Sequence, residues 1–257
     1  MSGHVHPKAA LGFARGARAY EHGRATFPAG AVAAILAETA AAPGRTLLEL
    51  GAGTGKLTRS LTGSGARVIA LEPVDEMRAV LAEAAPGAEP LAGVAEAIPL
   101  PAASVDAVIA AQAYHWFDPE AATAEVARVL RPGGAVALVW NRRDERVGWM
   151  RGLSAILDPV AGDAPRYKHG TWRRGFDGNP AFAPLALRTW PHRGAAGRDV
   201  VVARVASMSF VAAMDDGPRA ELLARIEHLL DTDPDTAGRD DVAMPYVTDL
   251  FTTRTRA

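Results

Sequence analysis

The chain of 257 residues contains no cysteine. A protein without thiols cannot form a disulfide framework, a thiolate metal site or a cysteine nucleophile. This single absence excludes small disulfide-rich secreted domains, zinc ribbons and thiol enzymes together.

An excess of positive charge is also lacking. The chain has 28 Lys and Arg against 29 Asp and Glu, which gives a formal net charge of -1. Dedicated nucleic-acid binders normally carry a basic excess, so we expect no nucleic-acid partner.

Long apolar runs are missing as well. The hydrophobic stretches are too short or too interrupted to span a bilayer, and the first ten residues lack the apolar run of a signal peptide. Hydrophobic residues still make up 49% of the chain, which is enough for a proper core. We therefore expect a cytoplasmic protein without a membrane partner, folded as a single domain over residues 1–257, and we leave its oligomeric state open.

Short apolar runs alternate with helical patterns in the first part of the chain. The sequence predicts strands at 46–50, 67–71, 104–111 and 134–140 and helices at 31–42, from 57, at 74–85 and at 119–130. Such alternation is typical of a doubly wound, mostly parallel α/β sheet, which binds ligands beyond the carboxyl ends of its strands. Residues 30–141 form the expected ligand-binding core.

The regular rhythm fails after Arg142. Residues 142–180 are rich in Arg, Gly and Pro and predict no regular element. The remaining pattern predicts strands at 182–192 and 244–253 and helices at 200–214 and 219–230. We expect two closing strands with a helical insertion between them, so that residues 142–243 cap the cleft and 244–257 close the sheet.

A glycine-rich loop follows the first predicted strand: Glu49-Leu-Gly-Ala-Gly-Thr-Gly55. A phosphate-binding P-loop is excluded because Leu57 follows Lys56. A dinucleotide fingerprint needs a third glycine where Lys56 stands. The remaining pattern is Glu-x-Gly-x-Gly-x-Gly with a second acid, Glu72, about 20 residues further on, where a carboxylate can accept both ribose hydroxyls.

These segments resemble the class I S-adenosylmethionine (SAM)-dependent methyltransferases. The runs Leu47-Leu-Glu-Leu-Gly-Ala-Gly-Thr-Gly55 and Ala70-Leu-Glu-Pro73 resemble the first two motifs of that family. The runs Gly93-Val-Ala-Glu-Ala-Ile-Pro-Leu-Pro101 and Ser104-Val-Asp106 resemble its adenine-binding segment and fourth strand. The resemblance implies a seven-stranded Rossmann-like sheet and SAM as the cofactor.

Other segments are similar to one branch of this family, the type 11 and trans-aconitate methyltransferase-like proteins, alongside the quinone C-methyltransferases. They are Ala111-Gln-Ala-Tyr-His-Trp-Phe-Asp118, Leu130-Arg-Pro-Gly-Gly134, Met244-Pro-Tyr246, and Tyr20 with Arg24 and Pro28. Two residues depart from the branch: Ala25 stands where it usually has Pro, and Phe27 where it often has Tyr.

The resemblance implies a set of cofactor-binding residues. In this set, the methionine part of SAM is lined by Glu49, Gly51 and Gly53, and the ribose is held by Glu72. Pro73 and Met77 lie near adenine, and Ala95 and Glu96 meet its edge. Gln112 lies beside the sulfonium, and Tyr20 and Arg24 close over the cofactor.

Aromatic residues after the fourth strand should lie at the methyl end of the cleft. Aromatic faces stabilise a sulfonium by cation–π attraction, which makes Tyr114 and Trp116 candidate substrate contacts. Trp140, at the end of the fifth predicted strand, is a further candidate contact. His115 is a candidate base because its pKa lies near working pH, but it can equally well orient a loop, and Trp140 can equally well be core. No His, Asp or Glu cluster has metal-ligand spacing, so we expect no metal.

Two features of the sequence bear on the chemistry of the substrate, and they point to different classes of molecule. Arginines at 142, 143, 173 and 174 admit an acidic small molecule, whereas the aromatics at 167, 172 and 176 suggest an apolar lining. The leading hypothesis is O-, N- or C-methylation of a small molecule, including acidic or natural-product-type substrates. A SAM-binding protein that transfers no methyl group is the alternative. A nicotinamide oxidoreductase is disfavoured by Lys56, and a nucleic-acid methyltransferase by the charge balance and the lack of an Asn/Asp-Pro-Pro-Tyr-type motif.

Overall fold

The computed structural model describes residues 26–162 and 165–256. Its α-helices are α2 (Ala29–Glu38), α3 (Thr58–Thr62), α4 (Asp75–Ala84), α5 (Pro119–Val129), α6 (Gly148–Ala161), α7 (Arg198–Ala206), α8 (Ser209–Ala212) and α9 (Asp216–Thr232). Short 3₁₀ helices are η1 (Tyr114–Trp116), η2 (Tyr167–His169) and η3 (Thr171–Gly175). The strands are β1 (Thr46–Leu50), β2 (Arg67–Leu71), β3 (Ala88–Leu91), β4 (Val105–Ala111), β5 (Leu130–Arg143), β6 (Ala186–Gly197) and β7 (Asp241–Arg254).

The strands form one seven-stranded sheet in the order β3-β2-β1-β4-β5-β7-β6. Pairing is parallel from β3 to β5, whereas β7 runs antiparallel to both β5 and β6. The predicted seven-stranded, mostly parallel α/β sheet is therefore confirmed, and β1 and β2 have the predicted bounds.

Side chains of the central strands alternate between two cores, as the period of two requires. Leu47 packs with Leu57 and Leu61 on the face that α2 and α3 cover. Leu48 packs with Val126 on the opposite face, which α5 and η3 cover. The sheet is thus buried between two helical layers, and its carboxyl edge remains to bind ligands.

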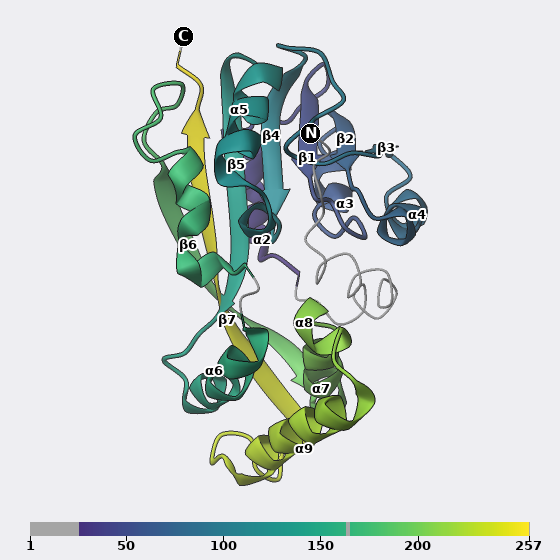
Figure 1. Cartoon of the computed structure of the whole chain (residues 1–257), viewed down its shortest axis with the longest axis vertical. Helices are drawn as coiled ribbons and strands as arrows, with labels where there is room; N and C mark the ends of the chain where they lie inside the picture. The colour runs from purple at the N-terminus through teal and green to yellow at the C-terminus, as the bar shows by residue number, and fades with distance from the viewer. Residues whose placement is uncertain (1–25, 163–164, 257) are drawn as a thin grey trace.

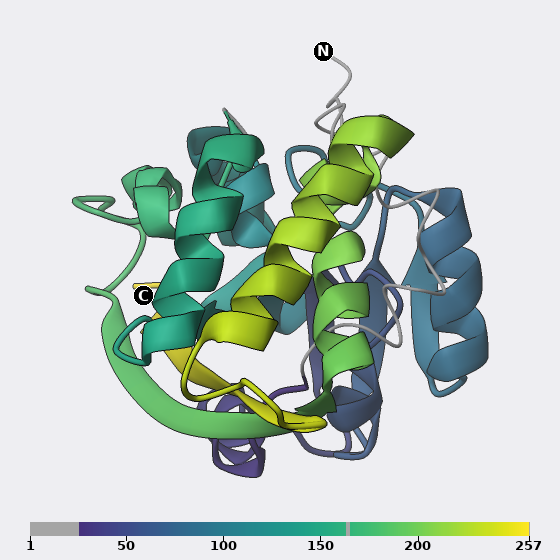
Figure 2. The same cartoon turned by 90° about the horizontal axis from the view of Figure 1, so that it is seen from below.

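A separate group of helices lies beyond that edge. Figure 1 shows α6, α7, α8 and α9 around the far ends of β6 and β7, and Figure 2 shows the same helices from below, lying across the edge of the sheet. They have their own apolar core, which includes Trp149, Leu153, Val205, Ile226 and Tyr246. We call α6 to α9 with these strand ends the cap.

The largest departure from the sequence prediction is α6. Residues 142–180 were expected to be irregular, and that prediction is wrong because Gly148–Ala161 forms a 14-residue helix. Trp149, Leu153 and Leu157 are buried on one side of it, a four-residue spacing typical of a helix. This helical pattern was missed in the sequence because Pro159 lies in the last turn of α6 and glycines lie at both of its ends.

The strand β3 was not located from the sequence. Its four residues, Ala88-Glu-Pro-Leu91, form an edge strand with a half-exposed pattern and no apolar run. Pro is tolerated there because an edge strand needs only one row of hydrogen bonds.

Several boundaries also move. The prediction of a single helix over 200–214 is wrong, because α7 ends at Ala206 and α8 begins at Ser209. The strand expected over 182–192 is β6, Ala186–Gly197. The helix α5 ends one residue early, and Leu130 already pairs with Val105 before a register shift.

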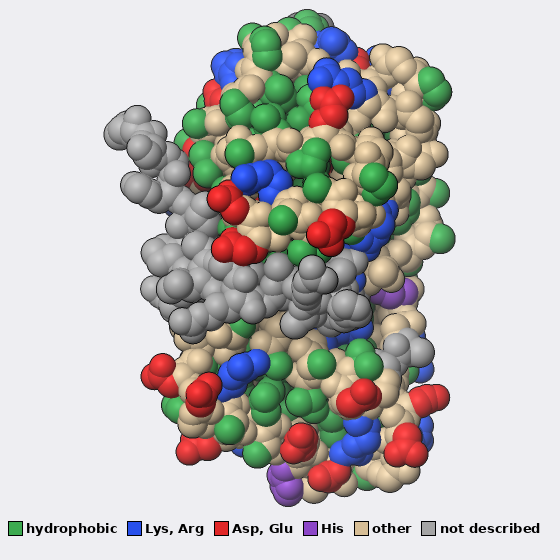
Figure 3. Space-filling model, turned by 90° about the vertical axis from the view of Figure 1, so that its right-hand side faces the viewer, with side chains coloured by type: hydrophobic (Ala, Val, Ile, Leu, Met, Phe, Trp, Pro, Cys, Tyr) green, Lys and Arg blue, Asp and Glu red, His purple; other side chains and the backbone are tan. Residues whose placement is uncertain are grey.

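Charges of both signs are interspersed on the molecular face in Figure 3, over the sheet part and the cap alike. Across residues 26–162 and 165–256, no helix combines the length and apolar composition needed to cross a membrane.

Candidate functional site

The loop after β1 is held by the end of β2. The backbone N–H of Ala52 donates to the Leu71 carbonyl at 3.1 Å. The Glu72 carboxylate accepts from the backbone N–H of Gly53 at 2.8 Å through Oε2 and from that of Val74 at 3.0 Å through Oε1. Each carboxylate oxygen has a second lone pair, so Glu72 can order the loop and still accept hydrogen bonds from a ligand.

Two glycines of this loop have different reasons to be glycine. Both have positive φ, +62° at Gly51 and +60° at Gly53, which side chains disfavour. A Cβ on Gly51 would lie 2.7 Å from the Ala113 Cβ, whereas a Cβ on Gly53 would meet no atom within 4 Å. Gly51 is therefore required by the packing of η1, and Gly53 leaves open space at the site.

Glu49 is a buried acid at the floor of the site, only 1% exposed. Its Oε2 accepts a hydrogen bond from the Thr58 hydroxyl at 2.7 Å. Burial raises the pKa of Glu49 from 4.5 to about 8, and the nearby Glu72 adds to this, while the Thr58 hydrogen bond opposes it. Near neutral pH this carboxyl is therefore mostly protonated, and a cation beside it would favour ionisation.

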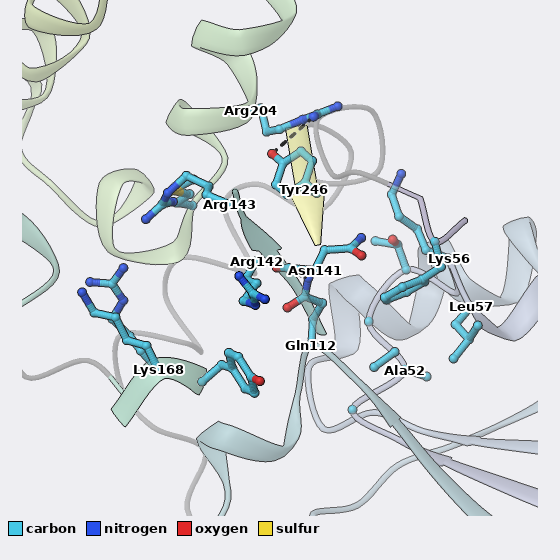
Figure 4. A pocket seen from close by; sticks show the side chains of 18 of the residues that line it. Ala52, Lys56, Leu57, Gln112, Asn141, Arg142, Arg143, Lys168, Arg204 and Tyr246 are labelled. Carbon is cyan, nitrogen blue, oxygen red and sulfur yellow. Dashed lines mark hydrogen bonds between the residues drawn. The ribbon is translucent and has the colours of Figure 1, made fainter. Parts of the chain in front are cut away.

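A cavity of about 330 Å³ opens between the glycine loop and the cap. It is lined by residues of the glycine loop, of the ends of β4 and β5, of the segments before α2 and at η2, and of the cap. These are Phe27, Glu49, Gly51, Ala52, Gly53, Thr54, Lys56, Leu57, Ala111, Gln112, Asn141, Arg142, Arg143, Glu145, Arg166, Tyr167, Lys168, Arg204, Met208 and Tyr246. Figure 4 shows Ala52, Lys56 and Leu57 on one side, with Arg143, Arg204 and Tyr246 on the other. This volume falls within the range of small-molecule sites.

Four of the residues predicted to bind the cofactor line this cavity: Glu49, Gly51, Gly53 and Gln112. Glu72 adjoins it through Gly53. Tyr20 and Arg24 lie outside the described residues.

The residues predicted near adenine do not line the cavity. Met77 and Ala95 are buried among core side chains, and Pro73 is half-buried. Glu96 accepts a hydrogen bond from the Asp118 backbone N–H at 2.9 Å, which ties residues 93–101 to the start of α5. Their role at adenine stays a prediction.

Gln112 has an unusual backbone for its residue type, with φ at +56°. Its backbone N–H donates to the Val139 carbonyl at 2.8 Å, and its Nε2 donates to the Asn141 carbonyl at 3.1 Å. Such strained conformations cost about 1–3 kcal/mol and cluster at functional sites. The contacts place Gln112 between the ends of β4 and β5, facing the cavity (Figure 4).

The aromatic segment after β4 does not line the cavity. Tyr114 is buried, and its hydroxyl lies 2.7 Å from Thr123 Oγ1. Trp140 is 0% exposed, stacks on Tyr167 and packs against Trp172 in a tilted arrangement. Trp116 is also absent from the cavity lining, so the structure does not bring these three predicted substrate contacts to the site.

His115 is held by Trp140, whose indole Nε1–H donates to His115 Nδ1 at 3.0 Å. An indole nitrogen only donates, so Nδ1 must be the acceptor and a neutral ring carries its proton on Nε2. Neither nitrogen is then available to remove a proton from a substrate. The geometry therefore favours the second interpretation of His115, that of a residue which orients its loop.

Of the four predicted arginines, Arg142 and Arg143 line the cavity. Arg173 instead pairs with Asp177, and Arg174 pairs with Glu120. The cap adds Arg204, Met208 and Tyr246, and the segment at η2 adds Arg166 and Lys168. Sequence reasoning assigned none of these five residues to the site. A local pattern could not find them, because they come from segments that are far apart in the chain. Groups of acids and histidines able to hold a metal are absent from the described residues.

The chain matches known proteins over nearly its whole length. A family model described as a methyltransferase domain matches residues 48–138. An uncharacterized methyltransferase of Mycobacterium tuberculosis is 41% identical over 244 residues, which cover 93% of each protein. An uncharacterized methyltransferase-like protein of Schizosaccharomyces pombe is 34% identical over 233 residues, covering 90% of this chain and 91% of that protein.

The fold also matches solved structures. That of a candidate type II methyltransferase from Anaeromyxobacter dehalogenans superposes with a TM-score of 0.61 and 25% identity, covering 91% of this chain and 97% of the other.

Proposed function

Because the chain belongs to the class I methyltransferase family, we propose that it binds SAM at the glycine loop and transfers the methyl group to a small molecule in the cavity. When bound, SAM supplies an electrophilic methyl group on a sulfonium, and the protein supplies binding, orientation and exclusion of water.

The observation that carries this proposal is the pairing of Gly53 with Glu72 beside the cavity. The loop leaves open space at the position where a Cβ on Gly53 would stand, and Glu72 is fixed next to it by two backbone N–H groups. An open backbone cradle with an adjacent carboxylate fits a ligand that carries ribose hydroxyls.

Two further residues fit the methionine end of such a ligand. The buried Glu49 carboxyl lines the cavity, and a cationic ligand group would favour its ionised form. The strained Gln112 presents its amide side chain at the same cavity. We assign to these two residues the orientation of the cofactor rather than any proton transfer.

Binding is tested by calorimetric titration with S-adenosylhomocysteine and, in parallel, with NAD. We expect the protein to bind S-adenosylhomocysteine and to show no heat with NAD. Gly53→Val should abolish that binding while the circular dichroism spectrum is kept, because the new side chain fills the cradle. Preference for NAD, or unchanged affinity in a folded Gly53→Val protein, contradicts the proposal.

Transfer is tested separately from binding. The protein is incubated with SAM labelled in its methyl group and a small-molecule fraction, and the label is followed into products by chromatography. Label in a small molecule, lost with Gly53→Val, supports methyl transfer. Tight binding without labelled product indicates instead a SAM-binding protein that does not methylate.

A further inference from the structure

Three side chains near the end of β5 form a hydrogen-bonded group beside the cavity. Asp249 of β7 accepts a hydrogen bond from Arg142 Nε of β5 at 2.7 Å and from the Tyr167 hydroxyl of η2 at 2.8 Å. Both bonds go to the same oxygen, Oδ2, so the guanidinium and the phenol oxygen converge on one point. Arg142 and Tyr167 line the cavity, whereas Asp249 is only 3% exposed and does not.

The sheet and the core fix this group in place. Trp140 and Asp249 are paired across β5 and β7, and Arg142 is two residues beyond Trp140, so the three side chains lie on one face of the sheet. The Tyr167 ring stacks on Trp140, with the ring centroids 4.9 Å apart. The ring of Tyr167 is therefore held by the core, and its hydroxyl is held by Asp249.

Tyr167 and Arg142 offer opposite hydrogen-bonding roles to a ligand. Burial and the bond to Asp249 raise the pKa of Tyr167 above its usual value, so the hydroxyl keeps its proton and donates it to Asp249. The lone pairs of Tyr167 Oη are left to accept. Arg142 spends Nε on Asp249, and within the described part of the chain its Nη groups make no hydrogen bond. A guanidinium only donates, so the pair presents one acceptor and one donor.

Such a pair matches a hydroxyl group. A hydroxyl donates its proton to Tyr167 Oη, accepts from an Nη group of Arg142, and keeps a second lone pair with which its oxygen can attack a methyl group. An amine nitrogen has a single lone pair, so a hydrogen bond from Arg142 would block its attack. A carboxylate brings no proton to donate to Tyr167. The pair therefore favours oxygen over nitrogen as the accepting atom.

The pair also borders the proposed cofactor site. Arg142 directly follows Asn141, whose carbonyl accepts a hydrogen bond from Gln112 Nε2 at 3.1 Å. Figure 4 shows Arg142 next to Asn141 and Gln112 in the middle of the cavity. Because Gln112 is one of the two residues assigned to orient the cofactor, a hydroxyl held by Arg142 and Tyr167 would lie on the cofactor side of the cavity.

One oxygen of Asp249 has no hydrogen bond. Asp249 Oδ1 is buried and finds no partner among the residues that the structure describes. Burial of an anionic oxygen without a donor costs free energy, and protonation of the carboxylate removes that cost. Asp249 is thus suited to take up a proton that reaches it through Tyr167.

We propose that Arg142 and Tyr167 bind an aromatic hydroxyl of the methyl acceptor and that Tyr167 relays its proton to Asp249. When the acceptor oxygen bonds the methyl carbon, the carbon–sulfur bond breaks and its electron pair stays on sulfur. The acceptor proton moves to Tyr167 Oη while the Tyr167 proton moves to Asp249 Oδ2, which leaves a neutral carboxyl. A carboxylate is a weak base, so an acidic phenol suits this relay better than an alcohol. The inference rests on the proposed function, since it identifies the accepting atom.

Binding of the hydroxyl is tested by fluorescence titration with 2-naphthol and with its methyl ether, 2-methoxynaphthalene, at saturating S-adenosylhomocysteine. We expect 2-naphthol to bind about 10-fold more tightly than the ether, which has no proton to donate. Tyr167→Phe keeps the ring that stacks on Trp140 and should remove this preference. Arg142→Gln should weaken 2-naphthol by about 10-fold, because a charge-assisted hydrogen bond is lost.

Tyr114→Phe and Arg174→Gln are matched controls, because they remove the same groups from residues that do not line the cavity. Both should leave the affinity for 2-naphthol unchanged. If Tyr167→Phe loses its circular dichroism spectrum, Arg142→Gln and its control carry the binding test.

Asp249→Asn tests the relay separately from binding. The Asn amide oxygen can still accept from the Tyr167 hydroxyl, but the amide does not take up a proton. The affinities for 2-naphthol and S-adenosylhomocysteine should therefore be kept. The kcat for transfer of a labelled methyl group from SAM to 2-naphthol should fall by about 10²–10⁴-fold, the usual effect of losing a base.

The outcomes separate this inference from the proposed function. Normal binding of S-adenosylhomocysteine without binding of 2-naphthol, or with equal binding of its ether, overturns the hydroxyl site and leaves the cofactor site standing. Unchanged 2-naphthol affinity in Tyr167→Phe also overturns it, and undiminished methyl transfer in Asp249→Asn overturns the relay. Binding of 2-naphthol that depends on Tyr167, without any binding of S-adenosylhomocysteine, overturns the proposed function alone.

Discussion

The Glu72 carboxylate accepts a hydrogen bond from the backbone N–H of Gly53 at 2.8 Å. Gly53 lies in the turn after β1, and Glu72 lies directly after the neighbouring strand β2. The hydrogen bond therefore fixes the glycine loop against the end of β2. The same carboxylate is 5% exposed, and burial raises its pKa, although the bonds from Val74 and Gly53 and the charge of Arg78 oppose this. Its position makes Glu72 both a support of the loop and a candidate ligand-binding group.

Replacement of Glu72 should therefore weaken cofactor binding. Glu72→Ala is expected to reduce affinity for S-adenosylhomocysteine by about 1–3 kcal/mol, because hydrogen bonds to a charged group are lost. Glu89→Ala on the adjacent β3 is a suitable control, since Glu89 is exposed and pairs with Arg67. Calorimetry that shows equal affinities for the two variants would exclude Glu72 from the site.

The two loop glycines should respond differently to the same substitution. Gly51→Ala places its Cβ against Ala113 and is expected to destabilise the fold by about 1–3 kcal/mol. Gly53→Ala meets open space, so its cost to stability is limited to about 1–2 kcal/mol from the positive φ, and its main effect should be on cofactor affinity. Urea denaturation and calorimetry measure the two effects. Reversed effects would show that Gly51, not Gly53, faces the ligand.

Glu49 should couple cofactor binding to pH. Because its pKa is raised from 4.5 to about 8, the unfolded chain ionises first, and the contribution of Glu49 to stability falls as pH rises between these values. A cationic group beside Glu49, here the α-ammonium of S-adenosylhomocysteine, lowers the pKa again, so binding should release a proton near pH 7 and tighten as pH rises toward 8. Titration of S-adenosylhomocysteine in buffers with different ionisation enthalpies detects this proton.

Glu49→Gln is the control for that coupling, because it is nearly isosteric and cannot ionise. The Glu49→Gln protein should release no proton when the ligand binds, and its free energy of unfolding should depend less on pH between 4.5 and 8. If the unaltered protein releases no proton on binding, Glu49 does not face the charged part of the ligand.

The contact of η3 with α5 should be intolerant of added volume. A Cβ on Gly175 would overlap Thr123 Oγ1 and the Pro119 carbonyl, so Gly175→Ala is expected to destabilise the protein by about 1–3 kcal/mol. Gly217→Ala in α9 meets nothing within 4 Å and should be neutral or stabilise by up to about 1 kcal/mol, as is usual for Ala in a helix. Thermal denaturation of both variants checks the difference, and similar melting temperatures would contradict this packing.

The sheet could be predicted because its signals are local. β1 and β2 are apolar runs between turns, and both have the predicted bounds. The loop from Glu49 to Gly55 was also identified from its spacing, and Glu49, Gly51 and Gly53 do line the cavity. These features could be predicted from the local sequence, because the conformation of each depends mainly on residues of its own strand and turn.

A cap over residues 142–243 was expected from the sequence, but its residues Arg204 and Tyr246 could not be assigned to the site, because their position depends on pairing between distant segments. Arg143 faces Tyr246 across β5 and β7, and Tyr246 contacts Arg204. These residues are far apart in the chain and share no motif. Conversely, Tyr114 was predicted at the methyl end and Trp140 as a candidate substrate contact, each from its place at the end of a strand. Large aromatic side chains there also fill the core, which is where the structure places both.

The most direct measurement of the central claim is a crystal structure of the protein with S-adenosylhomocysteine bound. The account predicts ribose hydroxyls within hydrogen-bond distance of Glu72, the methionine end beside Glu49 and Gln112, and the sulfur facing a cavity bordered by Arg143 and Arg204. A ligand bound away from Gly53, or one whose sulfur faces the core side of Trp140 instead of the cavity, would contradict it.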